Sequence, residues 1–397
     1  MELQLSGSAA VGHLLRRAGF GLAQADADTY RKLGFTGALD KLLDELDAPV
    51  PQDVEGFDPY EPGLIQQTWL DRMVRGESPL AEKLALFWHG HFATSNRKIQ
   101  EPLLMWRQYR LFRGRGAARF SDLVAAVSRD VAMIRWLDGN ANRKGTANEN
   151  YARELQELFT LGIGNYTEND VREAARAFTG WGSRRHDFVF TDGFHDHGQK
   201  TVHGTTGDLD GGDVVKILTA LPACHAFIAK KLLRFFSHND PTKAEVADLA
   251  SVLQRTRGDI RSALFMVFRS PAFLAQARHR ALVKSPIEFM VSALRVTGGT
   301  KVPLWAHGGL ERMGQILFQP PSVKGWPSGT AWLTSAGTVE RIRAARRLAK
   351  IFPDAAKTIV DLAFDNVMPN ELYQVLEKTQ GTERTAVVLA SPEFQLC

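Results

Sequence analysis

The sequence predicts an all-α fold: a large multi-helix domain with one short β-hairpin or irregular excursion near residues 186–203. Apolar residues recur every three to four positions from end to end, and strand-type alternation is scarce. Hydrophobic residues make up 44% and charged residues 23% of the chain, as in an ordinary globular protein. Only HDFVFTDGFHDHGQKTVH breaks the helical pattern, and Asp192-Gly193 is the expected turn within it.

The length predicts more than one structural unit. A chain of 397 residues exceeds the roughly 250–300 residues at which a single core stops growing. We expect a main helical domain at 1–300 that carries the polar motifs. A C-terminal helical part at 301–397, with a Pro/Trp-rich loop at 318–332, should pack on it.

Start and stop signals place the helices in order. Gly34 is a C-cap that separates a helix at 22–33 from one that begins near Thr36. Ser78 and Pro79 begin the next helix, after a Pro-rich loop at 48–63. The other expected helices are 7–18, 101–113, 120–139, 148–160, 167–179, 211–220, 222–236, 242–256, 259–269, 284–297 and 304–317, followed by a helical tail from 338.

Composition narrows the function classes. The net charge of +5 permits a polyanionic partner without arguing for one, and we do not expect nucleic acid. Cys224 and Cys397 belong to no metal-spaced set, and Cys224 lies in an apolar helical run as a buried thiol. No apolar run approaches ~18–20 residues, so no membrane span is expected. The expected location is cytoplasmic for the chain as numbered, and periplasmic or exported if a leader has been removed.

The stretch 140–181 holds the densest set of polar side chains. On a helical wheel, five residues of 148–160 share an arc of about 140°: Glu149, Asn150, Arg153, Glu154 and Glu157. A solvated face with Glu–Arg pairs four residues apart is the interpretation that wheel geometry favours. The alternative is the wall of a pocket, toward which Asn150 and Glu154 would point from the edge of the apolar face.

Asp130 falls inside the apolar stripe of the helix predicted at 122–137. A carboxylate that faces a core must be paired, coordinated or protonated. Two hypotheses are supported about equally: Asp130 forms a buried ion pair with an arginine, or it acts as a metal ligand or general base.

Two histidine pairs invite a metal interpretation. His89 and His91 diverge by ~200° on a regular helix and could share an ion only if the helix ends at Gly90. His91 also lies on the apolar stripe, where a core histidine is the commoner outcome. His195 and His197 share a face if their segment is extended, so they could chelate one metal, or His195 could pair with a carboxylate.

Familiar catalytic signatures are absent from the sequence. HGTTGDLDGGD at 203–213 fits neither a P-loop nor a calcium loop, and there is no GxSxG, HExxH or dinucleotide fingerprint. Trp326 and Trp332 near Pro320-Pro321 could present aromatic faces to a sugar or a partner. A rigid loop that plugs its rings into the core fits them at least as well.

Several runs resemble a bacterial family, the domain of unknown function 1800. They are HLLRRAGFG at 13–21, FWHGHFATS at 87–95, NENYAREL at 148–155, ELFTLG at 157–162, AARAFTGW at 174–181, His195-Asp196 with Gly198 and Lys200, LFQPP at 317–321 and Gly325-Trp326. The resemblance implies no established reaction. It implies that similar proteins often carry an export signal, and that they are often encoded beside a family resembling sulfatases and alkaline phosphatases. It also favours a shared pocket over an incidental charged face.

The resulting hypothesis is a metal-dependent or hydrolase-like enzyme with a carboxylate/His/Arg pocket. The expected catalytic residues are Asp130, Glu154, Glu157, His195 and Asp196. The expected substrate-binding residues are Asn150, Arg153, Lys200, Trp181 and Trp326, and a divalent metal would lie on His89 and His91. The alternative is a non-enzymatic module that binds a glycan, a polyanion or a protein in the same groove. The expected partner is an anionic ligand, a glycan or another protein.

Overall fold

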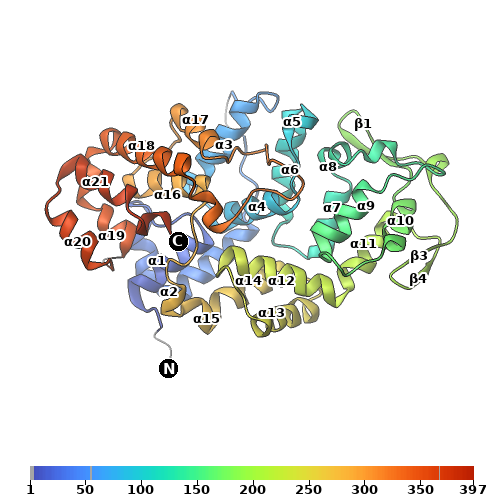
Figure 1. The fold of residues 1–397 in the computed structure, drawn as a ribbon, viewed down its shortest axis with the longest axis horizontal. Helices are drawn as coiled ribbons and strands as arrows, with labels where there is room; N and C mark the ends of the chain where they lie inside the picture. Colours follow the sequence, from blue (N-terminus) through green and yellow to red (C-terminus); the bar gives the residue numbers. More distant parts are fainter. Residues whose placement is uncertain (1–3, 54–55, 366) are drawn as a thin grey trace.

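The computed structural model describes residues 4–53, 56–365 and 367–397. Within them the chain is 64% helical, with 21 α-helices and two small antiparallel two-stranded sheets. The predicted all-α fold with one short β excursion is therefore confirmed. The molecule is elongated, with α20 and α21 at one end and the two β-hairpins at the other (Figure 1).

The first half of the chain supplies ten helices and both hairpins. The helices are α1 (Gly7–Ala18), α2 (Ala27–Asp44), α3 (Pro62–Arg75), α4 (Pro79–His91), α5 (Asn96–Ile99), α6 (Pro102–Arg115), α7 (Phe120–Ser128), α8 (Val131–Trp136), α9 (Asn150–Glu154) and α10 (Glu168–Ala177). A π-helix, η3 (Leu155–Thr160), continues α9. The strands are β1 (Trp181–Arg184), β2 (Asp187–Phe190), β3 (Lys200–Val202) and β4 (Thr205–Gly207).

The second half contains helices joined by loops, and no named strand lies among its described residues. Its helices are α11 (Gly211–Ala220), α12 (Pro222–Phe236), α13 (Lys243–Arg255), α14 (Ile260–Arg269), α15 (Pro271–Leu274), α16 (Pro286–Thr297), α17 (Leu304–Arg312), α18 (Ser335–Ile351), α19 (Ile359–Phe364), α20 (Asn370–Glu377) and α21 (Gly381–Ala390). Between α17 and α18 lies the expected Pro/Trp-rich loop, which contains a short 3-10 turn at Gly329–Trp332.

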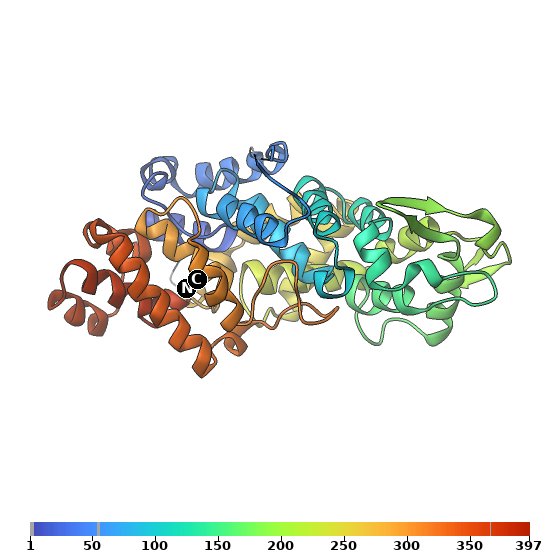
Figure 2. The same ribbon diagram turned by 90° about the horizontal axis from the view of Figure 1, so that it is seen from above.

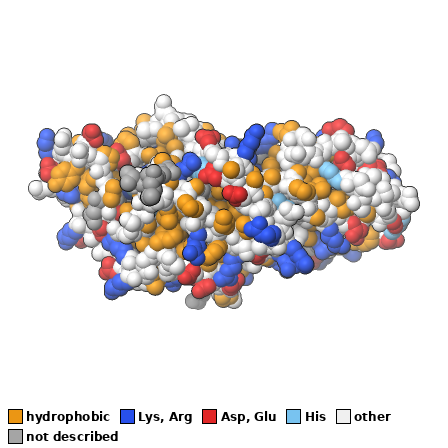
Figure 3. Space-filling model, turned by 90° about the horizontal axis from the view of Figure 1, so that it is seen from below, with side chains coloured by type: hydrophobic (Ala, Val, Ile, Leu, Met, Phe, Trp, Pro, Cys, Tyr) orange, Lys and Arg blue, Asp and Glu red, His pale blue; other side chains and the backbone are white. Residues whose placement is uncertain are grey.

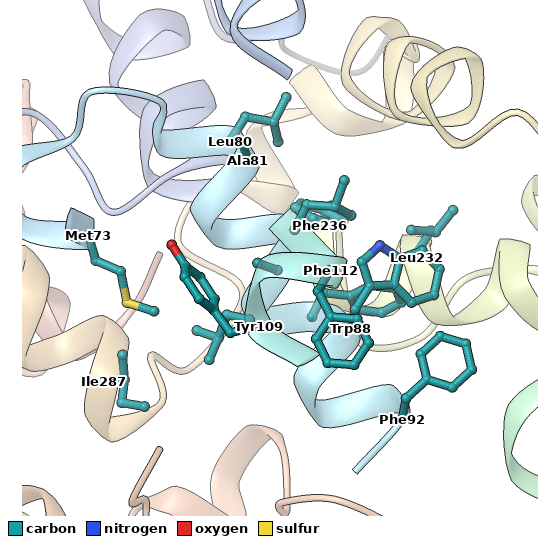
Figure 4. Packing of buried hydrophobic residues seen from close by; sticks show 14 of the residues in the cluster. Met73, Leu80, Ala81, Trp88, Phe92, Tyr109, Phe112, Leu232, Phe236 and Ile287 are labelled. Carbon is teal, nitrogen blue, oxygen red and sulfur yellow. The ribbon is translucent and has the colours of Figure 1, made fainter. Parts of the chain in front are cut away.

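The core is built around α4, which is buried along almost its whole length. Figure 4 shows Trp88 of α4 and Phe92, the residue that follows this helix, beside Phe112 of α6, with Leu232 and Phe236 of α12 close to them. The Trp88 and Phe92 rings stack 5.6 Å apart, and those of Phe92 and Phe112 are 6.1 Å apart. Aromatic pairs at such distances add to the free energy gained by burying their area, so this cluster anchors the middle of the molecule.

Local signals explain the ends of several helices. Gly34 has φ +66° inside α2, which breaks the helical geometry where the C-cap was expected. The Thr167 hydroxyl accepts a hydrogen bond from the Asp170 backbone N–H, and the Asp170 carboxylate accepts one from the Thr167 backbone N–H, so the predicted capping box of α10 is present. Pro79 begins α4 as expected, although the Ser78 side chain makes no capping bond.

The structure corrects four predictions of local structure. The helix expected at 120–139 is broken, because Asp130 adopts an extended backbone and caps α8. The turn expected at Asp192-Gly193 is wrong: the hairpins turn at 185–186 and at 203–204, while Asp192–Phe194 forms a 3-10 turn. Helix α3 was not anticipated, and part of the helix expected at 148–160 is a π-helix. Residues 54–55 of the loop expected at 48–63 lie outside the described residues.

The C-terminal helices pack against the N-terminal ones. A buried ion pair joins Arg16 of α1 to Asp365 at a distance of 2.6 Å, and Arg341 of α18 donates to the Lys284 carbonyl oxygen at 2.7 Å. From above, the blue and orange-to-red segments lie side by side, and the loop between α17 and α18 reaches beneath the blue helices toward the hairpin end (Figure 2). One continuous hydrophobic cluster runs through these parts.

The underside of the molecule mixes hydrophobic side chains with scattered Lys and Arg, and no single-sign field covers it (Figure 3). This distribution agrees with the modest net charge. No single helix among the described residues is both long and apolar enough to cross a membrane. The pair α11 and α12 meets that length and composition only when taken together, and the pair is bent by 72°.

Candidate metal centre in the hairpin segment

The segment between β2 and β4 is held by a turn at Gly180. Gly180 has φ +80°, and a Cβ there would lie 2.7 Å from the Thr191 carbonyl oxygen. Its own carbonyl oxygen accepts from the Thr191 N–H at 2.8 Å, while its N–H donates to Asn142 at 3.1 Å. A side chain at this position would push the following segment away, so a glycine is required.

Three side chains that could hold a metal ion meet here: His195, His197 and Asp208, hereafter the His–His–Asp cluster. One ligand atom from each lies within 4.8 Å of the others, and no other such group of three exists among the described residues. His195 and His197 come from the extended stretch before β3, as alternate residues sharing a face. Asp208 follows β4, which the tight turn at 203–204 returns alongside β3.

Hydrogen bonds orient the first two members of the cluster. His195 is buried, and its Nδ1–H donates to the Thr179 carbonyl oxygen at 2.8 Å. That bond places the proton on Nδ1 and leaves Nε2 with its lone pair, the usual arrangement for a metal-binding histidine. His197 is exposed and lies 3.4 Å from the Asp208 carboxylate and 3.1 Å from Asp192.

Lys200 supports the third member. Its ammonium is buried and donates to the Asp208 carboxylate at 2.9 Å, to the Gly198 carbonyl oxygen at 2.9 Å and to the Asp196 carbonyl oxygen. The hydrogen bond from Lys200 lowers the pKa of Asp208, and His197 adds to the effect. Asp208 is therefore ionised at neutral pH, as a metal ligand must be.

Asp196, expected to be catalytic, is engaged elsewhere. One of its carboxylate oxygens accepts from Arg176 Nε at 2.8 Å and the other from the Gly198 N–H at 2.8 Å. The bond from Arg176 lowers the pKa of Asp196 to about 2. Since Arg176 also binds Glu173 on α10, this network fastens the segment to α10.

His89 and His91, expected to hold the metal, do not share a site. His89 Nε2 accepts from the Phe318 N–H at 2.9 Å, and the ring lies against Trp69, Phe318 and Trp326. His91 donates from Nε2 to the Phe159 carbonyl oxygen at 3.0 Å and accepts at Nδ1 from Lys231. Helix α4 runs to His91 itself, so the two rings diverge as wheel geometry requires. Burial lowers the pKa of His89 to about 3 and that of His91 well below its ordinary value.

Asp130 makes neither an arginine pair nor a contact with the cluster. Its Oδ1 accepts from the Met133 N–H at 3.0 Å and from Gln108 Nε2 at 2.7 Å, so it serves as the N-cap of α8. Burial of the carboxyl raises its pKa to about 6, although both hydrogen bonds favour the ionised form. No hydrogen bond or ion pair in the described parts of the chain joins Asp130 to Glu154 or His195.

The polar face of 148–160 divides into two parts. Arg153 pairs with Glu149 at 3.0 Å and with Glu168 at 2.7 Å, which is the solvated arrangement that wheel geometry favours. Asn150 is exposed and donates weakly to Asp138 at 3.4 Å. These residues lie on the surface, outside the cluster.

Glu154 and Glu157 form the other part of that face. Both are partly buried; burial, and next the charge of Glu157, raise the pKa of Glu154, whereas Lys324 of the 318–332 loop opposes the rise. Glu157 accepts from the Tyr166 hydroxyl at 2.6 Å. The adjoining π-helix contacts His91 through Phe159, and contacts the second hairpin through Gln156, which lies 2.9 Å from His203. The π-helix thus reaches His91 and the second hairpin through Phe159 and Gln156, whereas no hydrogen bond or ion pair among the described residues joins Glu154 or Glu157 to His91, His195 or Asp130.

The two tryptophans differ in their surroundings. Trp181 is buried against Phe178 and Phe188, with the Arg129 guanidinium 5.2 Å from the ring centroid. Trp326 is partly exposed, and its indole N–H is buried without a partner among the described residues.

Sequence reasoning missed Asp208 as a candidate ligand. It was considered only as part of a calcium loop, and no spacing rule connects it to His195. The signal available was the short hairpin that the sequence KTVHGTTGD can form around His203-Gly204. Both residues have positive φ, as a two-residue hairpin turn needs, so Asp208 returns to the start of β3.

The family comparison agrees with this whole-chain arrangement. Residues 13–396 match the family described as "Protein of unknown function (DUF1800)", and the chain belongs to that family. The comparisons with curated proteins and with solved structures give no match. The class is therefore a largely helical family member with a His–His–Asp cluster able to hold a metal, and the chemistry must be argued from the cluster itself.

Proposed function

We propose that this protein is a metal-dependent hydrolase whose divalent ion is held by His195, His197 and Asp208. The observation that carries the proposal is the convergence of two imidazoles and a carboxylate within 4.8 Å. Two histidines and a carboxylate are the ligand set of many catalytic zinc sites and also of non-haem iron sites. Three protein ligands leave a coordination position open, where a bound water can ionise near neutral pH.

The surroundings support a cation at this place. Asp192 and Asp208 bring two carboxylates to His197, against the single ammonium of Lys200. Thr179 fixes the His195 tautomer, and Lys200 fixes Asp208. Such support around the ligands reduces the entropy that metal binding must pay to order them.

The neighbourhood also favours an anionic substrate. The Arg143 guanidinium lies 4.3 Å from the Phe194 ring centroid, and the Lys144 N–H donates to the Phe194 carbonyl oxygen at 2.8 Å. Both basic residues are exposed beside the segment that carries His195. The anionic phosphate group of a phosphate ester would find positive charge next to the metal.

Metal titration with a chelator in competition tests the proposal. The wild-type protein should take up one equivalent of Zn²⁺ or Mn²⁺. Structural zinc in four-ligand sites is worth about 10–16 kcal/mol, or about 3–4 kcal/mol per ligand, so removing one ligand should weaken binding roughly 100-fold or more. His195→Ala and Asp208→Ala should both show this loss.

Asp187→Ala is the matched control, because Asp187 is an exposed residue of the first hairpin whose carboxylate makes no hydrogen bond among the described residues. It should bind metal like the wild type. The metal-loaded protein should also hydrolyse p-nitrophenyl phosphate or p-nitrophenyl acetate, and it should lose that activity when a chelator removes the metal. The metal site is refuted if titration finds no stoichiometric ion, or if Asp208→Ala binds as tightly as Asp187→Ala. Tight metal binding without hydrolysis of any ester would refute only the hydrolytic role.

A further inference from the structure

A cavity of about 590 Å³ lies away from the hairpin end and from the His–His–Asp cluster. It is bounded by the end of α4, by α12, by the start of α16 and by the 326–332 part of the Pro/Trp-rich loop; we call it the Trp326 pocket. The loop is fixed to α4, because the Phe318 N–H donates to His89 and the backbone of Gly325 lies against Gly90. Its volume is typical of cavities that hold small organic ligands.

One part of the lining is aromatic and aliphatic. Leu86 and Phe87 come from α4, Phe235 comes from α12, and Trp326 and Trp332 come from the loop. The Trp326 ring packs on His89 with centroids 5.0 Å apart and remains partly exposed. A buried indole N–H without a protein partner is a costly donor to leave unpaired, and a ligand acceptor would relieve that cost.

The other part of the lining is positively charged. The Lys231 ammonium donates to His91 Nδ1 at 2.9 Å and to the Leu158 carbonyl oxygen at 3.2 Å. Arg234 uses only its Nε–H, which donates to the Asn239 carbonyl oxygen at 3.1 Å, so its other donors have no partner in the described parts of the chain. Burial lowers the pKa of Lys231 to about 8, so most of the amine is still charged at pH 7.

The one acidic side chain in the lining is already neutralised. Glu288 pairs with the buried Lys83 and also accepts from the Ser285 N–H at 2.7 Å. His91 is neutral, because its burial and the nearby ammonium disfavour a second charge. The pocket therefore presents two cations, Lys231 and Arg234, to whatever enters it.

We propose that the Trp326 pocket binds a small organic anion with an apolar ring. The anionic group lies between Lys231 and Arg234, and the ring lies on the aromatic wall formed by Trp326 and Phe235. Such a ligand should bind more tightly than a neutral ring or a small inorganic anion. A neutral ring satisfies only the aromatic wall, and an anion without a ring satisfies only the desolvated cation. The inference is independent of the metal centre.

Displacement of a fluorescent probe tests it. 8-Anilinonaphthalene-1-sulfonate, an aromatic anion, should bind the folded protein with a stoichiometry of one. Indole-3-acetate should displace it at concentrations at least tenfold lower than its neutral analogue indole-3-acetamide. Equal displacement by acid and amide would overturn the charge argument, and the absence of saturable binding would overturn the pocket.

Matched variants locate the site. Lys231→Met and Arg234→Gln should each weaken indole-3-acetate binding about tenfold or more, since charged hydrogen bonds are lost. Lys230→Met, which changes the exposed neighbour of Lys231 on α12, should bind like the wild type. Because Arg234 is exposed, Arg234→Gln tests the proposal even if Lys231→Met fails to fold. Equal affinity for Arg234→Gln and Lys230→Met would refute the site.

Discussion

Replacement of Asp130 tests whether its carboxylate has a structural or a catalytic role. The hydrogen bonds that it accepts from the Met133 N–H and from Gln108 Nε2 reach the same oxygen, Oδ1. Asp130→Asn can therefore keep both bonds, because an amide oxygen takes the place of Oδ1 and asparagine caps helices about as well as aspartate. Asp130→Ala loses both.

The magnitudes follow from those two bonds. Loss of the cap costs about 1 kcal/mol. Gln108 is buried, and its amide would lose its partner, which costs about 1–3 kcal/mol more. Asp130→Ala should thus lower the free energy of unfolding by about 2–4 kcal/mol, and Asp130→Asn should change it little near pH 4.

The free energies of unfolding of Asp130→Asn and of the wild type should diverge as the pH rises. The pKa of Asp130 is raised to about 6, so between about pH 4 and 6 the folded protein keeps a proton that the unfolded chain has released. The contribution of this group to stability therefore falls across that window and stays lost above it. The full shift would be worth about 3 kcal/mol, which solvent screening of this partly exposed residue reduces to about 1 kcal/mol. Asp130→Asn lacks this loss, so at pH 7 it should be about 1 kcal/mol more stable than the wild type.

Urea unfolding followed by circular dichroism at pH 4.5 and pH 7 measures all three proteins. A loss in Asp130→Asn as large as that in Asp130→Ala would refute the capping argument. Parallel pH dependences of Asp130→Asn and the wild type would refute the raised pKa. An Asp130→Asn protein that is folded and stable but inactive on every ester cleaved by the wild type would instead restore the catalytic hypothesis for this residue.

Three further predictions concern other parts of the fold. Glu82→Ala should lower the free energy of unfolding by about 3–5 kcal/mol, because it leaves the buried Arg113 unpaired; denaturant titration should show a smaller loss for Glu82→Gln. Thr167→Ala removes the capping box of α10 and should cost about 1 kcal/mol in the same assay, whereas no change would contradict the cap. Gly325 has φ +81°, and Gly325→Ala would place a Cβ 2.3 Å from the Gly90 carbonyl oxygen. The substitution should therefore displace the loop and weaken probe binding in the Trp326 pocket. Unchanged binding would show that the loop does not shape the pocket.

Helical periodicity and capping residues were enough to predict most of the fold. Helix α1 begins and ends at the predicted residues, and Thr167, Pro79 and Gly34 mark boundaries where local chemistry decides them. The break at Asp130 escaped prediction because apolar spacing continues across it. A cap inside a continuous stripe cannot be distinguished on a wheel from a carboxylate that faces the core.

The candidate site was less accessible to sequence reasoning. His195 and His197 could be paired because they are alternate residues of one extended segment. Asp208 joins them only through a hairpin whose two turn residues both adopt positive φ. Lys231 escaped notice because its importance depends on His91 and on a loop almost a hundred residues later in the chain. Long-range packing, which no local rule encodes, decides such sites.

The ion pair between Arg16 and Asp365 joins positions 349 residues apart, which has a consequence for folding. During synthesis α1 leaves the ribosome early, while its partners in α19 leave it near the end. Until then α1 lacks both this buried ion pair and its contact with α19. Non-local contacts of this kind slow folding and leave aggregation-prone intermediates. Refolding from denaturant should therefore be slow and its yield should fall with protein concentration, and in the cell the nascent chain is expected to depend on chaperones.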